Sequence, residues 1–295
     1  MELRHLRYFV RTAELLHFTR AAESLFISQP TLSAHIQQLE EELGCELFAR
    51  IGRKVQLTDA GNILLQHARH ALAEVETATN EIDASNGLLR GSLSIAASPA
   101  WSSRLLPGWI TAFSAIHPDV HVMARSASSE DLEAGVLSGE LAIAFSYVPT
   151  THHEITNVEL MKDEVVAVMH RTHRLAKKSQ LTAEDFHGLP LALSTHRILI
   201  FSAVNKFFAE LKVNPTVRVQ YDDGLALQEI VKLSTLVTLL PRTCIRLDDE
   251  LAVVRLPAPG ITVTLGALVT HFSPAINAFL DVAKESVKVL QELPR

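Results

Sequence analysis

The chain has 295 residues, of which 47% are apolar, and its formal net charge is −6, so it can bury a large core and is predicted to form two or three domains. No window approaches the roughly 18 uninterrupted apolar residues of a membrane helix, and the first residues are too charged for a signal peptide, so we expect a cytoplasmic protein without membrane contact. Cys45 and Cys244 lie far apart and form no CxxC pair, so neither a disulfide framework nor a cysteine zinc site is supported.

The charges of residues 1–58 are balanced in number but unevenly distributed. This segment has seven basic and seven acidic side chains, with four acids in residues 40–46 and three bases in residues 50–54. The acidic net charge of the whole chain disfavours nucleic acid as a partner. A short basic patch can nevertheless contact phosphate in a neutral domain.

Two helices are predicted at the start of the chain. Apolar residues at helical spacing predict a first helix that ends near His17: Leu3, Leu6, Phe9, Val10, Ala13 and Leu16. A second, short helix follows, with Thr19 as its N-cap and with Ala21, Ala22 and Leu25 inside it. Its small alanines permit close approach of another helix.

The third predicted helix has one apolar side and one polar side. Ser28 is its expected N-cap, Pro30 is tolerated in its first turn and Gly44 ends it. The apolar side is formed by Leu32, Ile36, Leu39 and Leu43, and the polar side by Gln29, Thr31, Ser33, His35 and Gln37. Gln can bind an adenine edge, and Ser or Thr can bind a base or a phosphate, so the arrangement fits a helix-turn-helix in a major groove. A plain helical hairpin packed into a larger core is the alternative.

A basic hairpin and a long helix are predicted next. Residues 46–50 and 55–57 are predicted to be strands around Gly52, with Arg50, Arg53 and Lys54 at the tip, where bases touch the DNA backbone. Thr58 then caps a helix that reaches residues 86–87, roughly 42 Å at 1.5 Å per residue. Its apolar stripe is Leu65, Ala68, Leu72, Val75 and Ile82. Such a helix either crosses its own domain or pairs with a second subunit.

From Gly91 the pattern changes to alternating strands and helices. Strands SLSIAAS, HVMARSAS and LAIAFSYV alternate with helices that end near Ile116 and Ser138, which predicts an α/β domain with a mostly parallel sheet. The unit recurs in VRVQYDDGLALQEIVKLSTLVTLLP, acidic helix start included, so two similar halves are predicted. A strand near 262–270 and the helix after Pro274 are expected to return to the first half.

Ligands of such sheets bind beyond the carboxyl ends of the strands, near helix N-termini. Three loops fit this description: residues 98–102 after the first strand, residues 126–129 after the second, and residues 194–197 at the start of the other half. The candidate ligand-binding residues are Ser98, Pro99, Ala100, Trp101, Ser102, Ser128, Ser194, Thr195, His196, Arg197 and Phe201. Hydroxyl groups, helix ends and one arginine favour a small organic or inorganic anion, such as a carboxylate. A serine before a helix can equally be a cap, and Trp101 can equally belong to the core.

The sequence FTRAAESLFISQPTLSAHIQQLEEELG, followed by LFAR and LTDAG, resembles the N-terminal domain of LysR-type transcriptional regulators over about sixty residues. The resemblance implies that Gln29, Pro30, Thr31 and Ser33 lie in or beside the recognition surface and Arg53 in the wing. Many members carry a basic residue after the serine, where this chain has Ala34 and then His35. The full set of candidate DNA-binding residues is Thr19, Ser28, Gln29, Pro30, Thr31, Ser33, His35, Gln37, Arg50, Arg53 and Lys54.

The resemblance also implies a domain order. A winged helix-turn-helix covers residues 1–58, a linker and dimerisation helix covers 59–87, and an α/β effector-binding domain covers 88–295. That domain is similar to periplasmic binding proteins: subdomain I covers about 91–161 and 266–295, subdomain II about 162–265, and the ligand lies in the cleft between them. The implied partners are double-stranded DNA, further copies of the chain in a homodimer and homotetramer, and RNA polymerase. The stretch LVTLLP resembles the branch that includes the cyanate-responsive regulator.

Other functions are less consistent with the sequence. A solute-binding protein would match the second part, but it would need an export signal and no DNA-binding domain. An enzyme is disfavoured because GxSxG, GxxxxGK[ST] and a suitably placed GxGxxG are absent, so we expect no catalytic residues and no cofactor besides the effector. A metal at His170 and His173 or at His152 and His153 is disfavoured by the lack of HExxH, and a redox sensor by the single cysteine of this domain.

Overall fold

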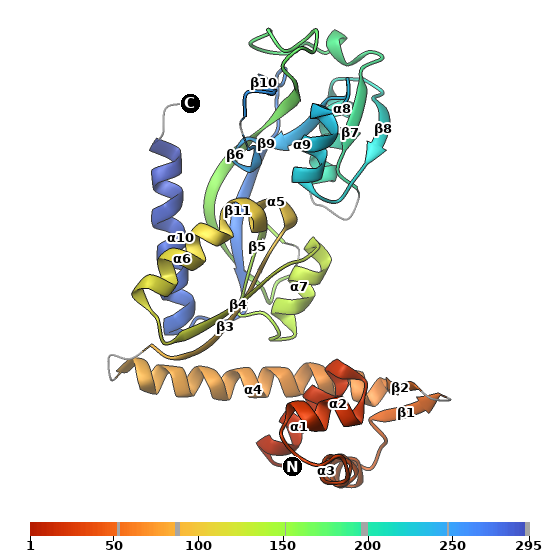
Figure 1. Ribbon diagram of the computed structural model, residues 1–295, viewed down its shortest axis with the longest axis vertical. Coiled ribbons are helices and arrows are strands. Elements are labelled where there is room, and N and C mark those ends of the chain that lie inside the picture. Colours follow the sequence, from red (N-terminus) through yellow and green to blue (C-terminus); the bar gives the residue numbers. More distant parts are fainter. Residues whose placement is uncertain (52–53, 86–88, 151, 196–199, 247, 293–295) are drawn as a thin grey trace. The chain divides into compact units, whose positions relative to one another are not determined.

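The computed structural model of the chain describes residues 1–295 except 52–53, 86–88, 151, 196–199, 247 and 293–295 (Figure 1). The chain divides into two compact units, one of Met1–Leu88 with Ser138–Glu140 and one of Leu89–Leu137 with Leu141–Arg295. Within the described residues, no helix combines the length and the apolar character that crossing a membrane requires.

Three helices, a hairpin and a long helix form the first unit. The helices are α1 (Leu3–Leu15), α2 (Phe18–Ser24), α3 (Gln29–Leu43) and α4 (Asp59–Ser85), and the hairpin joins β1 (Phe48–Ile51) to β2 (Lys54–Leu57). As predicted, the Ser28 hydroxyl caps α3 by accepting the N–H of Thr31, and Gly44 ends the helix in the left-handed conformation with φ +70°. The prediction for α2 was wrong: its N-cap is His17, whose Nδ1 accepts the N–H of Arg20, and Thr19 lies inside the helix.

The core of the first unit explains the orientation of α3. Side chains from α1, α2, α3 and α4 meet in one apolar cluster of buried residues: Leu6, Phe9, Ala21, Ala22, Leu32, Ile36, Leu39, Leu47 and Ala68. Leu32, Ile36 and Leu39 follow one another along a single side of α3. Burying this side leaves the opposite side of α3 to solvent.

Side-chain hydrogen bonds join the hairpin to the helices on both sides of it. Glu40 of α3 accepts the N–H groups of Leu47 and Phe48 at 2.7 and 3.2 Å. Thr58 caps α4, as predicted, because its hydroxyl accepts the N–H of Gly61 at 3.0 Å. β1 and β2 pair antiparallel from Phe48 opposite Leu57 to Ile51 opposite Lys54. The hairpin of β1 and β2, which we call the wing, is therefore held by hydrogen bonds at both of its ends.

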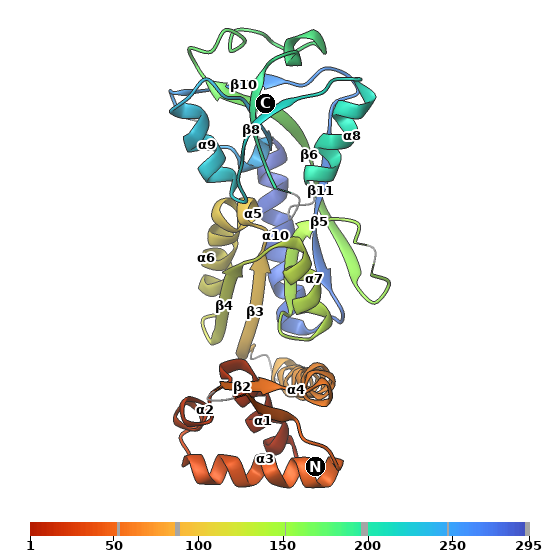
Figure 2. The same cartoon turned by 90° about the vertical axis from the view of Figure 1, so that its right-hand side faces the viewer.

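The second unit contains a seven-stranded mixed sheet (Figures 1 and 2). The strand order is β10-β6-β11-β5-β3-β4, and β9 also pairs with β6. The strands are β3 (Gly91–Ala97), β4 (Val120–Ser126), β5 (Ile143–Tyr147), β6 (Thr156–His170), β9 (Thr238–Pro241), β10 (Leu251–Arg255) and β11 (Thr262–Val269). A separate parallel pair joins β7 (Pro190–Leu193) to β8 (Thr216–Gln220).

Helices cover both faces of the sheet near β3 and β5. One face packs against α6 (Leu106–Ile116) and α10 (Pro274–Glu292), where Trp109, Phe113, Phe145 and Phe279 form an aromatic cluster. The other face packs against α7 (Ser129–Leu137), where Ala96 of β3 and Ala144 of β5 cluster with Leu132 and Val136 of the helix. The remaining helices are α5 (Pro99–Arg104), α8 (Ile200–Glu210) and α9 (Gly224–Lys232), with 3₁₀ turns at Glu184–Phe186 and Arg242–Cys244.

The order of strands and helices agrees with the sequence prediction, but the mostly parallel sheet does not. Among the described strands, the β4-β3-β5 and β7-β8 pairs are parallel, whereas β6, β9, β10 and β11 pair antiparallel. The reason is that β6 and β11 are long return strands that run past each other, which periodicity within single segments does not reveal. The predicted repeat is present as β8, α9 and β9, and the return of the chain as β11 and α10.

We predict opposite effects of two glycine-to-alanine changes. A Cβ at Gly61 would lie 2.2 Å from the Leu47 carbonyl oxygen and 2.9 Å from Leu57 Cδ2, so Gly61→Ala should lower the free energy of unfolding by about 1–3 kcal/mol. Gly108, in α6, has no atom within 4 Å of such a Cβ, so Gly108→Ala should raise it by about 0.5–1 kcal/mol. Denaturant unfolding measures both; equal effects would contradict the described packing.

Candidate functional sites

The first turn of α3 presents polar side chains to solvent. Ser28, Gln29, Pro30 and Thr31 are all exposed, whereas Leu32, the next residue, is fully buried. Free N–H groups at such a helix start favour an anion, for example a phosphate oxygen. The exposed polar side chains and the free N–H groups therefore lie at the same end of α3.

Internal hydrogen bonds order this polar end. The hydroxyls of Ser28 and Thr31 are 2.7 Å apart, and Gln29 Nε2 donates to Ser33 Oγ at 3.0 Å. Gln37 is exposed further along the helix and donates to Glu41 at 3.0 Å. The Gln29 amide keeps its carbonyl oxygen and one N–H available, which are the two groups that pair with an adenine edge.

His35 departs from the expectation of an exposed polar side. Its ring is half-buried and lies 5.2 Å from the rings of both His5 and Tyr8 in α1. Its Nδ1 is buried without a hydrogen-bond partner within the described chain. Burial, and then the nearby Arg4 and His5, lower the pKa of His35. This side chain contributes to the packing of α3 on α1, and only part of it faces outward.

The remaining candidates of the first unit are described to different degrees. Thr19 is exposed on α2. Arg50 and Lys54 lie in β1 and β2, but their side chains, like Arg53 as a whole, lie outside the described residues.

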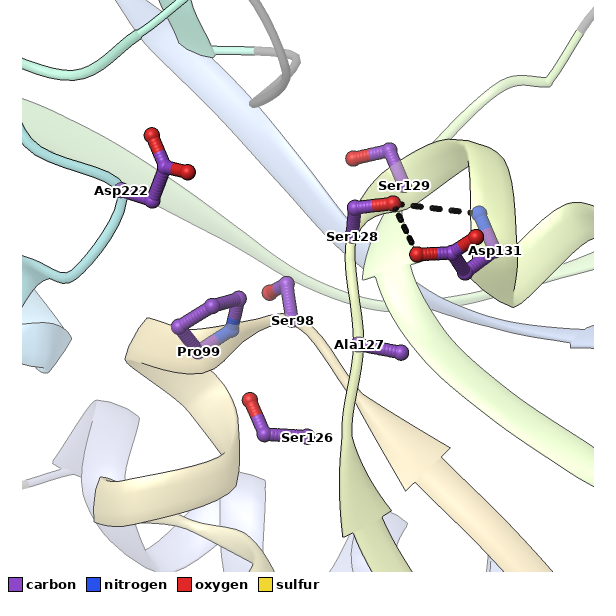
Figure 3. Close-up of a pocket in the computed structure, with 8 residues that line it drawn as sticks. All are labelled: Ser98, Pro99, Ser126, Ala127, Ser128, Ser129, Asp131 and Asp222. Carbon is purple, nitrogen blue, oxygen red and sulfur yellow. Dashed lines mark hydrogen bonds between the residues drawn. The ribbon is translucent and has the colours of Figure 1, made fainter.

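The second unit has a cavity of about 330 Å³ (Figure 3). It is lined by Ser98, Pro99, Ser126, Ala127, Ser128, Ser129, Asp131 and Asp222. The first two follow β3, Ser126 ends β4, Ala127 and Ser128 connect it to α7, Ser129 and Asp131 lie in the first turn of α7, and Asp222 lies between β8 and α9. The cavity therefore lies at the carboxyl ends of parallel strands, the kind of position for which the sequence analysis predicted a ligand site.

Two hydroxyl groups of the cavity wall are buried and have no partner. Ser98 is 1% exposed and Ser129 is 6% exposed, and neither Oγ makes a hydrogen bond within the described chain. Figure 3 shows both hydroxyls turned toward the space between them and Asp222. A buried hydroxyl without a partner costs about 1–3 kcal/mol, which a bound polar ligand would recover.

Ser128 differs from these two serines because it caps α7. Its Oγ accepts the N–H of Asp131 at 3.2 Å and donates to the Asp131 carboxylate at 2.7 Å. The alternative role of a serine before a helix, that of a cap, therefore applies to Ser128, and the buried Ser98 and Ser129 make no such bond.

The other predicted effector residues are placed around the cavity or away from it. Trp101 is completely buried, packs against Tyr147 with ring centroids 5.6 Å apart and does not line the cavity. The Thr195 hydroxyl, two residues after the end of β7, donates to the Asp222 carboxylate of the cavity wall. Ser194 is buried, Ser102 and Phe201 are half-buried, Ala100 lies in α5, and His196 and Arg197 lie outside the described residues.

Asp131 and Asp222 line the cavity but were not predicted as site residues. Both follow the carboxyl end of a strand, in SSED and YDDG, and the repeated acidic helix start was the signal that could have identified them.

The histidine pairs of the second unit have ordinary partners. His170 and His173 line another cavity, of about 370 Å³, and the Nδ1 of each accepts a backbone N–H. His152 Nε2 lies 3.3 Å from Glu133, and His153 is exposed. Among the described residues, no group of three or more His, Cys, Asp or Glu side chains could hold a metal ion.

Comparison with protein families gives two matches that together span most of the chain. Residues 3–62 match the bacterial regulatory helix-turn-helix protein, lysR family, and residues 86–288 match the LysR substrate binding domain. The Hca operon transcriptional activator HcaR of Escherichia coli is 32% identical over 293 residues, covering 97% of this chain and 98% of HcaR. The transcriptional dual regulator GltC of Bacillus subtilis is 28% identical and covers 99% of both chains.

Two solved structures have the same fold. A full-length OxyR variant from Pseudomonas aeruginosa superposes with a TM-score of 0.79 at 23% identity, covering 98% of this chain and 95% of that chain. Full-length CbnR in complex with its target DNA superposes with a TM-score of 0.69 at 24% identity, covering 97% and 100% of the two chains.

We predict that His35 makes the chain sensitive to acid. Its pKa in the folded chain lies below the ordinary value of about 6.5, so below that pH the unfolded chain binds a proton that the folded chain resists, and stability falls as the pH falls. His35→Gln should therefore lose less of its unfolding midpoint than the parent chain between pH 7.5 and 5.5. The exposed His153→Gln is the control, and equal losses in all three proteins would show that His35 titrates normally.

Proposed function

The chain belongs to the LysR family of transcriptional regulators, and we propose that it reads its DNA site with the exposed first turn of α3. It is a DNA-binding regulator with a helix-turn-helix and an effector-binding domain, and it is not an enzyme. The observation that carries the proposal is the division of α3 into a buried apolar side and an exposed start with Ser28, Gln29, Pro30 and Thr31. Ser33 and Gln37 extend this surface, with a smaller part for His35.

Positively charged side chains of the wing would contact the DNA backbone. We assign this role to Arg50, Arg53 and Lys54 from their place in the hairpin sequence, and Thr19 on α2 is the further phosphate contact. Backbone contacts fix the position of the protein on the duplex, while the α3 side chains distinguish bases. Because these basic residues are close together in the wing sequence, a chain with net charge −6 could bind DNA through this local basic surface.

The linker helix α4 would join two copies of the chain. Ala68, in the middle of its apolar stripe, is buried in the core of its own unit, so this part of the stripe serves the subunit itself. Ile63 and Ile82 are 62% and 65% exposed on the same helix and could be covered by a second copy. Two DNA-binding domains that bind one DNA site together make more contacts with it than a single domain does. We further propose a tetramer, with domain boundaries after residues 58 and 87.

The effector-binding domain would hold a small carboxylate in the cavity beside Ser98, Ser128 and Ser129. The start of α7 and the unpartnered hydroxyls of Ser98 and Ser129 support this ligand chemistry. Pro99, Ala100, Trp101, Ser102, Ser194, Thr195, His196, Arg197 and Phe201 would complete or support the site. Binding regulates transcription only if the ligand has different affinities for two arrangements of the subunits. RNA polymerase would be the partner in the cytoplasm that responds to this change.

Replacing Gln29 by Ala should weaken binding to the specific site by about 1–3 kcal/mol and change binding to random DNA little. The specific site is a duplex selected from a random pool with the parent chain, and fluorescence anisotropy gives the affinities. Gln38→Ala is a matched control, because Gln38 is exposed on the opposite side of the same helix. Arg53→Ala should instead weaken all sequences and reduce the salt slope by about 1. Equal losses on specific and random DNA for Gln29→Ala would contradict the proposed reading surface.

Replacing Ile63 by Glu should dissociate the proposed dimer, because it places a charge in an apolar contact between two copies of α4. Light scattering after size-exclusion chromatography should show a lower mass than the parent chain at the same concentration. Val289→Glu introduces the same charge at a 56% exposed apolar position of α10 and should leave the mass unchanged. An unchanged mass for Ile63→Glu would exclude this part of α4 from the interface.

A further inference from the structure

The charges of the cavity wall are more specific than a site for a simple anion requires. In the part of the wall that the structure describes, which does not include His196 and Arg197, the ionisable side chains are the carboxylates of Asp131 and Asp222. A ligand that carries only a negative charge would be repelled by both groups. The wall therefore favours a ligand that also has a positively charged group.

Asp131 is already used by the protein itself. Its carboxylate accepts the Ser128 hydroxyl at 2.7 Å, and its N–H donates back to that hydroxyl, so the pair closes the first turn of α7. An acid in the first turn of a helix also interacts favourably with the helix dipole. Asp131 thus has a structural reason to be where it is, independent of any ligand.

Asp222 has no such structural role. The cap of α9 is its neighbour Asp223, whose Oδ1 accepts the N–H groups of Leu225 and Ala226 at 2.7 and 3.1 Å. Within the described chain, the Asp222 carboxylate accepts one hydrogen bond, from the Thr195 hydroxyl, and has no ion pair. Figure 3 shows this carboxylate on the cavity wall across from Ser129. Its remaining acceptor sites are available to a donor from the ligand.

The opposite wall has the complementary chemistry. Ser98 and Ser129 offer buried hydroxyl donors without partners, and α7, a helix of 9 residues, begins at Ser129 with N–H groups that its own turns do not use. Donors at a helix start bind carboxylate groups. One ligand that spans the cavity would place its carboxylate there and its donor at Asp222.

We propose that the effector is an amino acid, with its carboxylate at Ser98, Ser129 and the start of α7 and its ammonium group at Asp222. The inference depends on the proposed effector-binding function and adds the chemical class of the ligand. A cavity of about 330 Å³ is at the small end of the range for ligand sites, which fits a molecule of this size. The negative charge of Asp222 would also disfavour a carboxylate that has no amino group.

The test is isothermal titration of the full chain with each of the twenty standard amino acids. For leucine, 4-methylpentanoate and leucinamide are the matched compounds that lack the amino group and the carboxylate charge, and the tightest binder is tested with its own two analogues. We expect at least one amino acid to bind roughly tenfold more tightly than either analogue. Asp222→Asn should reduce that affinity about tenfold, since Asn removes the negative charge that attracts the ammonium group, and it should not weaken the analogue without an amino group.

Two further variants distinguish a specific contact between Asp222 and the ammonium group from a general effect of substitution on folding. Asp249→Asn removes an exposed carboxylate outside the cavity and should change no affinity. Ser129→Ala should weaken the amino acid and the analogue without an amino group by the same factor. The inference is wrong if no standard amino acid binds with a dissociation constant below about 1 mM. It is also wrong if Asp222→Asn leaves the ratio between the affinities for the amino acid and for the analogue without an amino group unchanged.

The same titrations distinguish this inference from the proposed function. If no amino acid binds but a different small molecule binds the chain and changes its affinity for the selected duplex, the inference that the effector is an amino acid is wrong. The proposed regulator with an effector site would still stand. Loss of specific DNA binding by the parent chain would overturn the proposed function itself.

Discussion

The burial of one side of α3 is the constraint on which the first unit depends. Leu32, Ile36 and Leu39 enter a core built from α1, α2 and α4, so the rotation of α3 about its axis is fixed. The Ser28 cap fixes where the helix starts, and Glu40 connects its far half to the wing. With rotation and start both set, the polar first turn faces outward. Burial of the apolar side chains of α3 thus exposes the surface that is proposed to contact bases. A local basic surface is then enough for contact with the DNA backbone, although the net charge of the chain is negative.

The second unit applies a similar principle to a small molecule. Parallel strands β3 and β4 end at the same edge of the sheet, and the segments after them bring serine hydroxyls and the start of α7 to one cavity. Asp222 reaches this cavity from the segment between β8 and α9, which belongs to the second copy of the repeated pattern. The cavity combines donors and acceptors because two repeats of one unit contribute to it. A ligand with two unlike ends matches this composition better than a ligand with one.

Much of this arrangement could be predicted from the sequence because local signals carry it. Helical spacing, Ser28, Gly44 and Thr58 set the elements of the first unit, and the alternating pattern from Gly91 set most of the second. The N-cap of α2 could not be predicted, since a histidine ring takes the place that Thr19 would fill. The orientation of His35 and the antiparallel pairing of β6 and β11 depend on contacts between distant segments. The repeated acidic helix start could have marked Asp222 as a site residue, but its position opposite Ser129 depends on the fold.

The central claim is that the first turn of α3 contacts base edges, and photocrosslinking tests it most directly. A photoreactive amino acid at Thr31 would be irradiated in the complex with the selected duplex, with the same group at Thr111, exposed on α6, as the control. The account predicts crosslinks from position 31 to bases at one place within the selected site, and none from position 111. Crosslinks from position 31 that are absent, or that are spread equally over random duplex, would contradict it.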